Sequence, residues 1–152
     1  MKRLTENLLV PTDFSDASLL AVRAAKLLAQ QNDAKLTLCH VYDARGVLFG
    51  ARPGIDSGAS VGVDEEARIH EELRKMREGE LADVENVKTA LVLAPNPSAG
   101  IVDYAAKEDV DMIVISTHGR TGLTRALIGS VAERVVRHAH CPVLTLRSHA
   151  KD

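Results

Sequence analysis

The sequence predicts an α/β fold in which a parallel β-sheet carries helices on both faces. Short apolar segments rich in Val, Ile and Leu alternate with longer segments of helical period, as in chains built from successive β-α units. The chain has 152 residues, of which 45% are hydrophobic and 26% charged, so it can bury one core without disulfides or a structural metal. We therefore expect a single domain over residues 1–152.

The first elements follow from local signals. A strand is expected at residues 7–11, where Pro11 ends it. A helix follows because Ser15 suits the N-cap and because Ala and Leu recur every three or four positions up to about residue 31. A second strand is expected at residues 35–41. Residues 43–62 then contain five glycines and little periodicity, which indicates a long loop inside the domain.

The remaining elements continue the alternation. A helix from residue 64 has acidic residues in its first turn and Gly79 at its end. Asn96 and Pro97 suit the N-cap and the first position of the next helix, which ends near residue 109. The other expected elements are strands at residues 87–93, 110–116 and 141–147 and a helix that begins at residues 129–130. Four consecutive apolar residues in the fourth strand predict that it is covered on both faces, at the centre of the sheet.

Composition excludes several classes of function. The net charge is only -2, which excludes an overall basic footprint for nucleic acid or an acidic membrane. No apolar run approaches the roughly 18 residues that a membrane-spanning helix needs. Aromatic residues make up 3% of the chain, too few for a site that stacks a row of bases. The two cysteines, Cys39 and Cys141, are too few for a disulfide framework, so we expect a reduced intracellular protein without nucleic-acid or membrane partners.

Candidate chemistry lies where the strands end, because open parallel sheets bind ligands outside the carboxyl ends of their strands. Thr12 and Asp13 follow the first strand, and the small residues at 116–122 follow the fourth. Together with a helix start at residues 129–130, the second segment is suited to an anion cradle of backbone N–H groups. The same glycines also suit simple turns, and spacing alone does not decide between these interpretations. The sequence contains neither a P-loop nor a dinucleotide-binding fingerprint.

Several stretches carry a resemblance to a known family. They read VPTDFS at residues 10–15, HV at residues 40–41, STHGRTG at residues 116–122, GSVAERV at residues 129–135 and HCPVL at residues 140–144. In this order the chain resembles the universal stress protein family along its whole length, most specifically in the C-terminal stretch. The resemblance implies a three-layer α/β sandwich with a five-stranded parallel sheet in the order 3-2-1-4-5, and a cytoplasmic homodimer.

The family also implies a ligand. Its ATP-binding members resemble the pattern Gly, two residues, Gly, nine residues, Gly, Ser or Thr, which Gly119, Gly129 and Ser130 match. Ser116 stands at the first glycine position, where its side chain either obstructs the phosphates or donates a hydrogen bond to them. The resemblance then implies ATP, with Mg²⁺ or Mn²⁺ held by its phosphates. The implied contacts are Pro11, Thr12 and Asp13 near the adenosine, the Val41 backbone and Ile115 at the adenine, and Gly119, Gly129, Ser130 and Val131 around the ribose and phosphates. Ser116, at the first glycine position, is counted among the nucleotide-binding residues with them.

Several of these residues have structural alternatives. Asp13 also suits the cap of the first helix. Ser130 and Glu133 have the spacing of a capping box, which would turn a carboxylate toward a bound triphosphate. His138, His140 and Cys141 straddle a helix end and a strand start, so we predict no metal site there.

Three functional classes remain. The leading one is an ATP-binding regulatory protein of the stress response, and the alternative is a dimeric stress or interaction module that binds no nucleotide, which Ser116 favours. An enzyme, a slow ATPase or a nucleotidyl transferase, is the third, although Asp13 is the only strand-end acid near the cradle that could act as its base. Val143, Leu144 and Leu146 would form an exposed apolar edge in a monomer, so we predict a homodimer through the last strand, Pro142 to Arg147.

Overall fold

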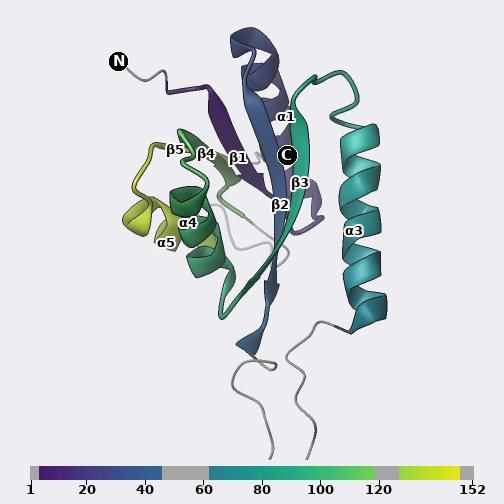
Figure 1. Cartoon of the computed structure of the whole chain (residues 1–152). Helices are drawn as coiled ribbons and strands as arrows, with labels where there is room; N and C mark the ends of the chain where they lie inside the picture. The colour runs from purple at the N-terminus through teal and green to yellow at the C-terminus, as the bar shows by residue number, and fades with distance from the viewer. Residues whose placement is uncertain (1–3, 46–61, 119–126, 148–152) are drawn as a thin grey trace, which may run out of the picture.

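The computed structural model describes residues 4–45, 62–118 and 127–147 (Figure 1). Its elements are β1 (Asn7–Pro11), α1 (Asp16–Asn32), β2 (Lys35–Asp43), α3 (Val63–Glu78), β3 (Val87–Ala94), α4 (Pro97–Lys107), β4 (Met112–Ser116), α5 (Ser130–His138) and β5 (Val143–Leu146). Each predicted strand is present, with ends within two residues of the predicted ones. Most of the expected loop at residues 43–62 lies outside the described residues.

The five strands form one parallel sheet in the order β3-β2-β1-β4-β5, which confirms the predicted fold class and strand order. The prediction that the fourth strand is the centre of the sheet was wrong, because β1 occupies that place. An uninterrupted apolar run indicates that helices cover the strand on both faces of the sheet, and any inner strand of a parallel sheet is covered in this way. β4 is an inner strand between β1 and β5, so it carries the same pattern without being central.

Two helices cover each face of the sheet, and Figure 1 shows α4 and α5 on one side and α3 on the other. Successive side chains of a strand point to opposite faces, so Leu8 and Val10 pack with α1 and α3 while Leu9 packs with α4 and α5. All three are fully buried. Burial of each such side chain stabilises the fold by about 1.5–3 kcal/mol, which holds the strand ends in fixed positions.

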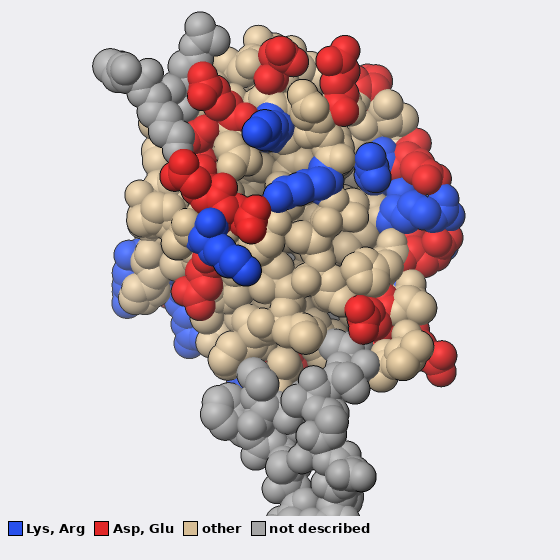
Figure 2. Space-filling model, viewed as in Figure 1, with Lys and Arg blue, Asp and Glu red and all other residues tan. Residues whose placement is uncertain are grey.

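Helix α3 carries charge on its outer face, as expected for its run of acidic and basic residues. Arg74 bonds to Glu71 at 2.7 Å and to Glu78 at 2.5 Å, one turn away on either side. Ile69 and Leu73 of the same helix are buried. Figure 2 shows Lys and Arg interspersed with Asp and Glu over the face in view, so the described residues form no large patch of one charge there.

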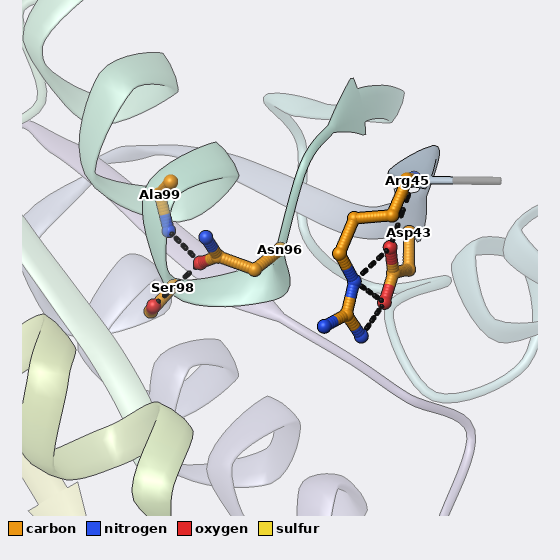
Figure 3. Close-up of polar contacts among 5 residues, drawn as sticks. All are labelled: Asp43, Arg45, Asn96, Ser98 and Ala99. Carbon is orange, nitrogen blue, oxygen red and sulfur yellow. Dashed lines mark hydrogen bonds and ion pairs between the residues drawn. The ribbon is translucent and has the colours of Figure 1, made fainter. Parts of the chain in front are cut away.

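The two predicted side-chain caps are confirmed. The Ser15 hydroxyl accepts a hydrogen bond from the Ser18 N–H at the start of α1. At the start of α4 the Asn96 Oδ1 accepts from the Ala99 N–H at 2.9 Å and from the Ser98 hydroxyl at 2.8 Å (Figure 3). These caps fix where each helix leaves the carboxyl edge of the sheet.

Candidate functional site

A cavity of about 300 Å³ lies at the carboxyl edge of the sheet. Its wall combines the ends of β1, β2 and β4 with the N-terminal parts of α1, α4 and α5. The volume is at the lower end of the range for small-molecule sites, about 300–1,000 Å³. Nine of the ten predicted binding residues line it: Pro11, Thr12, Asp13, Val41, Ile115, Ser116, Gly129, Ser130 and Val131. The tenth, Gly119, lies outside the described residues.

Asp13 stands at the end of β1 and orders the turn into α1. Its Oδ1 accepts hydrogen bonds from the N–H of Ser15, at 3.0 Å, and from the Ser15 hydroxyl. Ser15, not Asp13, caps α1, so the alternative role of Asp13 as a helix cap was wrong. The cap falls two residues further on because the turn itself uses the carboxylate of Asp13. Asp13 therefore keeps its place in the cavity wall with its carboxylate fixed by the next residues.

The residues around Asp13 are held by a second set of contacts. The Thr12 hydroxyl lies 3.0 Å from the Ser18 hydroxyl and accepts from the Phe14 N–H at 3.0 Å. Phe14 has a φ of 64°, in the left-handed region that a bulky residue rarely adopts. Its ring stacks on His40 with centroids 4.8 Å apart, and His40 Nδ1 bonds to the Thr12 carbonyl oxygen at 2.8 Å. This packing compensates for the strained backbone beside the cavity.

The part of the wall between the sheet and α4 is apolar. Val41 and Ile115, both predicted, are joined there by Ile101 of α4, and all three are at least nine-tenths buried. Gly100 makes this approach of α4 possible, because a Cβ on it would lie 2.6 Å from a Val41 methyl group. A flat apolar ligand group fits such a wall without aromatic stacking.

The turn after β4 forms the opposite part of the wall. Thr117 donates its N–H to the Leu146 carbonyl of β5 at 2.8 Å, and its hydroxyl contacts Nδ1 of His118 at 3.0 Å. The other ring nitrogen of His118, Nε2, is buried and has no hydrogen-bond partner. It is the only buried side-chain polar atom without a partner among the described residues. Buried polar groups are normally satisfied, so this nitrogen is an exception that the hydrogen bonds of the described residues do not explain.

Helix α5 starts against this turn. The Gly129 N–H donates to the Thr117 carbonyl oxygen at 2.6 Å, and a Cβ on Gly129 would lie 2.8 Å from the same oxygen. Gly129 is the N-cap and Ser130 is the first helical residue, with no side-chain cap. The capping-box interpretation of Ser130 and Glu133 was therefore wrong. The close approach to Thr117 requires glycine at the cap position and moves the serine one residue into the helix.

The start of α5 offers hydrogen-bond donors to the cavity. The first three residues of a helix have no acceptor within it, and in α5 these are Ser130, Val131 and Ala132, all of which line the cavity. Glu133 is turned along the helix, where it bonds to Arg137 at 2.5 Å. Its carboxylate is thus paired on the helix surface, as binding of a phosphate chain at this helix start requires.

Sequence reasoning missed part of the wall. Seven further residues line the cavity: Ser18, His40, Pro97, Ile101, Thr117, His118 and Ala132. The α4 residues among them are apolar, and β3 ends on Ala94. The sequence therefore has no polar residue that indicates a contribution of α4 to the site. The predicted site does not include His118, and only the fold shows that its Nε2 is buried.

The two cysteines and the Asp43–Arg45 pair, none of which lines the cavity, offer it no reactive chemistry. Complete burial raises the pKa of the Cys39 thiol to about 12, and burial also raises the pKa of Cys141. Both thiols are therefore protonated at neutral pH. At the exposed end of β2 the Arg45 guanidinium holds the pKa of Asp43 below its usual range, and Figure 3 shows the two side chains paired. No Lys or Arg lines the cavity among the described residues.

The described residues contain no group of three or more His, Cys, Asp or Glu side chains able to hold a metal ion. In that same part of the chain, no helix has the length and apolar character needed to cross a membrane.

Known proteins resemble this chain in both sequence and structure. The universal stress protein family matches it over residues 5–147. Universal stress protein MJ0531 of Methanocaldococcus jannaschii is 36% identical, across 99% of this chain and 87% of that protein. The solved structure of UspA from Lactobacillus plantarum has a TM-score of 0.79 at 32% identity, covering 96% of this chain and 100% of that one. A universal stress protein solved in complex with cAMP has a TM-score of 0.72 at 25% identity, covering 97% and 100%.

Proposed function

The chain belongs to the universal stress protein family, and from that membership we propose that it is a regulatory protein of the stress response that binds ATP. The observation that carries this proposal is the gathering of nine predicted binding residues around one cavity. A related structure, 25% identical, was solved with an adenine nucleotide, cAMP, which supports a ligand of this class.

The chemistry of the wall suits the parts of ATP. The apolar surface of Val41 and Ile115 suits adenine, and the backbone N–H groups at the start of α5 suit phosphate oxygens. Because no Lys or Arg among the described lining residues offsets the phosphate charge, we propose that Mg²⁺ or Mn²⁺ enters with the nucleotide and is held by its phosphates.

We propose binding rather than rapid turnover. Asp13 is the only carboxylate among the described residues of the wall, and both the N–H and the hydroxyl of Ser15 already bond to its Oδ1. Such an acid is held in the structure and is a poor general base.

Equilibrium binding of labelled ATP in the presence of Mg²⁺ tests the proposal. Wild type should bind one ATP per chain, with unlabelled cAMP as a competitor. Gly129→Val should abolish binding, because its side chain would force Thr117 and α5 apart. Gly62→Val is the matched control, since Gly62 is also an N-cap glycine but has no atom within 4 Å of its added Cβ. Absence of saturable binding by the wild type would refute the function.

We propose further that the protein works as a homodimer in the cytoplasm, where its two free cysteines stay reduced. β5 is an edge strand, paired with β4 alone among the described strands. Leu144 on β5 is 38% exposed and Val136 on the neighbouring α5 is 50% exposed. A second copy paired at β5 would cover both side chains and the open edge.

The mass of the protein in solution tests the dimer. Light scattering at micromolar concentration should give twice the chain mass for wild type and the chain mass for Leu144→Lys. Leu27→Lys is the control, since Leu27 is exposed on α1 and is not part of the β5 edge. A monomeric wild type would count against the dimer.

A further inference from the structure

Ser116 is the one residue of the predicted site whose type departs from the glycine pattern, and its place in the fold is well defined. It is the last residue of β4, pairs with Leu146 of β5 and is 9% exposed. Its backbone is part of a regular strand, a conformation open to every residue. The backbone at this position therefore does not require glycine.

The Ser116 side chain bonds to its own chain. Its hydroxyl donates to the His118 carbonyl oxygen at 2.8 Å and so closes the turn that follows β4. A hydroxyl has one hydrogen to donate, and here that hydrogen is used. Ser116 is therefore not a phosphate donor in this structure, and its side chain has a defined role inside the protein instead.

The turn that Ser116 closes connects the sheet to the start of α5. Within it, Thr117 donates its N–H to Leu146 at 2.8 Å and accepts the N–H of Gly129 at 2.6 Å. Residues 116–118 are thus bonded to β5 on one side and to the cap of α5 on the other. A change in the shape of this turn would shift the first turn of α5 relative to the rest of the wall.

We propose that Ser116 is a positioning residue for nucleotide binding: its bond to His118 fixes the turn so that the donors of α5 meet the phosphates. This inference rests on the proposed ATP binding. In this role Ser116 favours the binding of the phosphates, whereas an obstructing side chain would weaken it. Replacing it by glycine would remove the hydrogen bond and add backbone freedom, so the change toward the glycine pattern should weaken binding.

Calorimetric titration of the full chain with ATP and Mg²⁺, and separately with adenosine, tests this role. Ser116→Ala and Ser116→Gly should each bind ATP about fivefold more weakly, the net effect of one neutral hydrogen bond. Ser116→Thr keeps the hydroxyl and should restore the wild-type affinity. The adenosine affinity should not change in any variant, because adenosine has no phosphate to meet α5.

Ser98→Ala controls for loss of a buried serine hydrogen bond in general. Ser98 is 7% exposed, donates to Asn96 at 2.8 Å and does not line the cavity. This variant should melt at a lower temperature than wild type yet bind ATP with unchanged affinity. If Ser116→Gly binds ATP as tightly as wild type, or if adenosine binding weakens equally, Ser116 is not a positioning residue. If wild type itself binds no ATP, the proposed function is refuted and this inference with it.

Discussion

Replacement of Gly129 by alanine tests the central structural claim, that α5 starts in direct contact with the turn after β4. The added Cβ would lie 2.8 Å from the Thr117 carbonyl oxygen, whereas ordinary contact begins at 3.4 Å. The two segments must therefore separate by about 0.6 Å. If the shift lies along the hydrogen bond from Gly129 to Thr117, the distance from the Gly129 nitrogen to the Thr117 oxygen would grow from 2.6 Å to about 3.2 Å. That distance is the upper limit for N–H···O hydrogen bonds.

The cost of this separation follows from overpacking. Forcing one extra carbon into a packed site costs about 1–3 kcal/mol in the free energy of unfolding. For a chain of 152 residues this corresponds to a fall of about 2–12 °C in melting temperature. Gly62→Ala serves as the control because both glycines are N-caps with similar backbone angles and neither makes a side-chain cap bond. Any general cost of alanine at an N-cap thus cancels between the two variants.

Urea unfolding followed by circular dichroism measures both free energies under the same conditions. Gly129→Ala should lose stability relative to Gly62→Ala, whose added Cβ has no atom within 4 Å. Equal stability of the two variants would show that α5 does not press against Thr117 in solution. It would also remove the structural basis for placing the α5 donors in the cavity wall.

Two further predictions concern stability. Burial raises the pKa of Cys39 to about 12, so in the folded chain its thiol stays protonated at pH values where the unfolded chain ionises. From about pH 9 to 12 the unfolding free energy of wild type should therefore fall more steeply with pH than that of Cys39→Ala, by up to about 1.4 kcal/mol per pH unit. Urea titrations at several pH values measure both free energies, and parallel pH dependences would contradict this prediction. Asn96→Ala should lower the free energy of unfolding by about 1 kcal/mol, because it removes the side-chain cap of α4. Asn96→Asp keeps a cap acceptor and should lose less stability in urea unfolding. Equal losses for the two variants would exclude the cap as the cause.

Most of the fold could be predicted because its signals are local. Ser15 and Asn96 cap their helices through their own side chains, and the strands are short apolar segments between turn residues. The central position of β1 has no such signal. Its sequence resembles that of any strand covered on both faces, and only the pairing of strands far apart in the chain decides the order.

The capping box at Ser130 failed for a related reason. The spacing of Ser130 and Glu133 satisfies the local pattern, and nothing in residues 129–133 reveals that the chain must pass within hydrogen-bond distance of Thr117. That contact joins two segments that are distant along the sequence. It selects glycine for the cap, and the serine becomes the first residue of the helix.

The residues themselves predicted the site where strand ends carry polar or small side chains, whereas its apolar members Val41 and Ile115 were predicted only from the family resemblance. Parallel strands end at one edge, so residues after β1, β2 and β4 had to meet there. The contribution of α4 had no chemical signal, because Pro97 and Ile101 resemble ordinary helix and core residues. Shape complementarity, unlike hydrogen bonding, leaves no recognisable residue type in a sequence.

Thr117 joins the two surfaces to which we assign function. Its carbonyl oxygen accepts from the cap of α5 in the cavity wall, and its N–H and hydroxyl both reach the Leu146 carbonyl oxygen of β5, at 2.8 and 3.3 Å. Three hydrogen bonds on one residue leave its peptide little room to move independently of its neighbours. A displacement of the cavity wall at Thr117 must therefore displace the end of β5, the strand proposed to pair with a second copy. This short connection therefore joins the proposed nucleotide cavity to the proposed dimer edge.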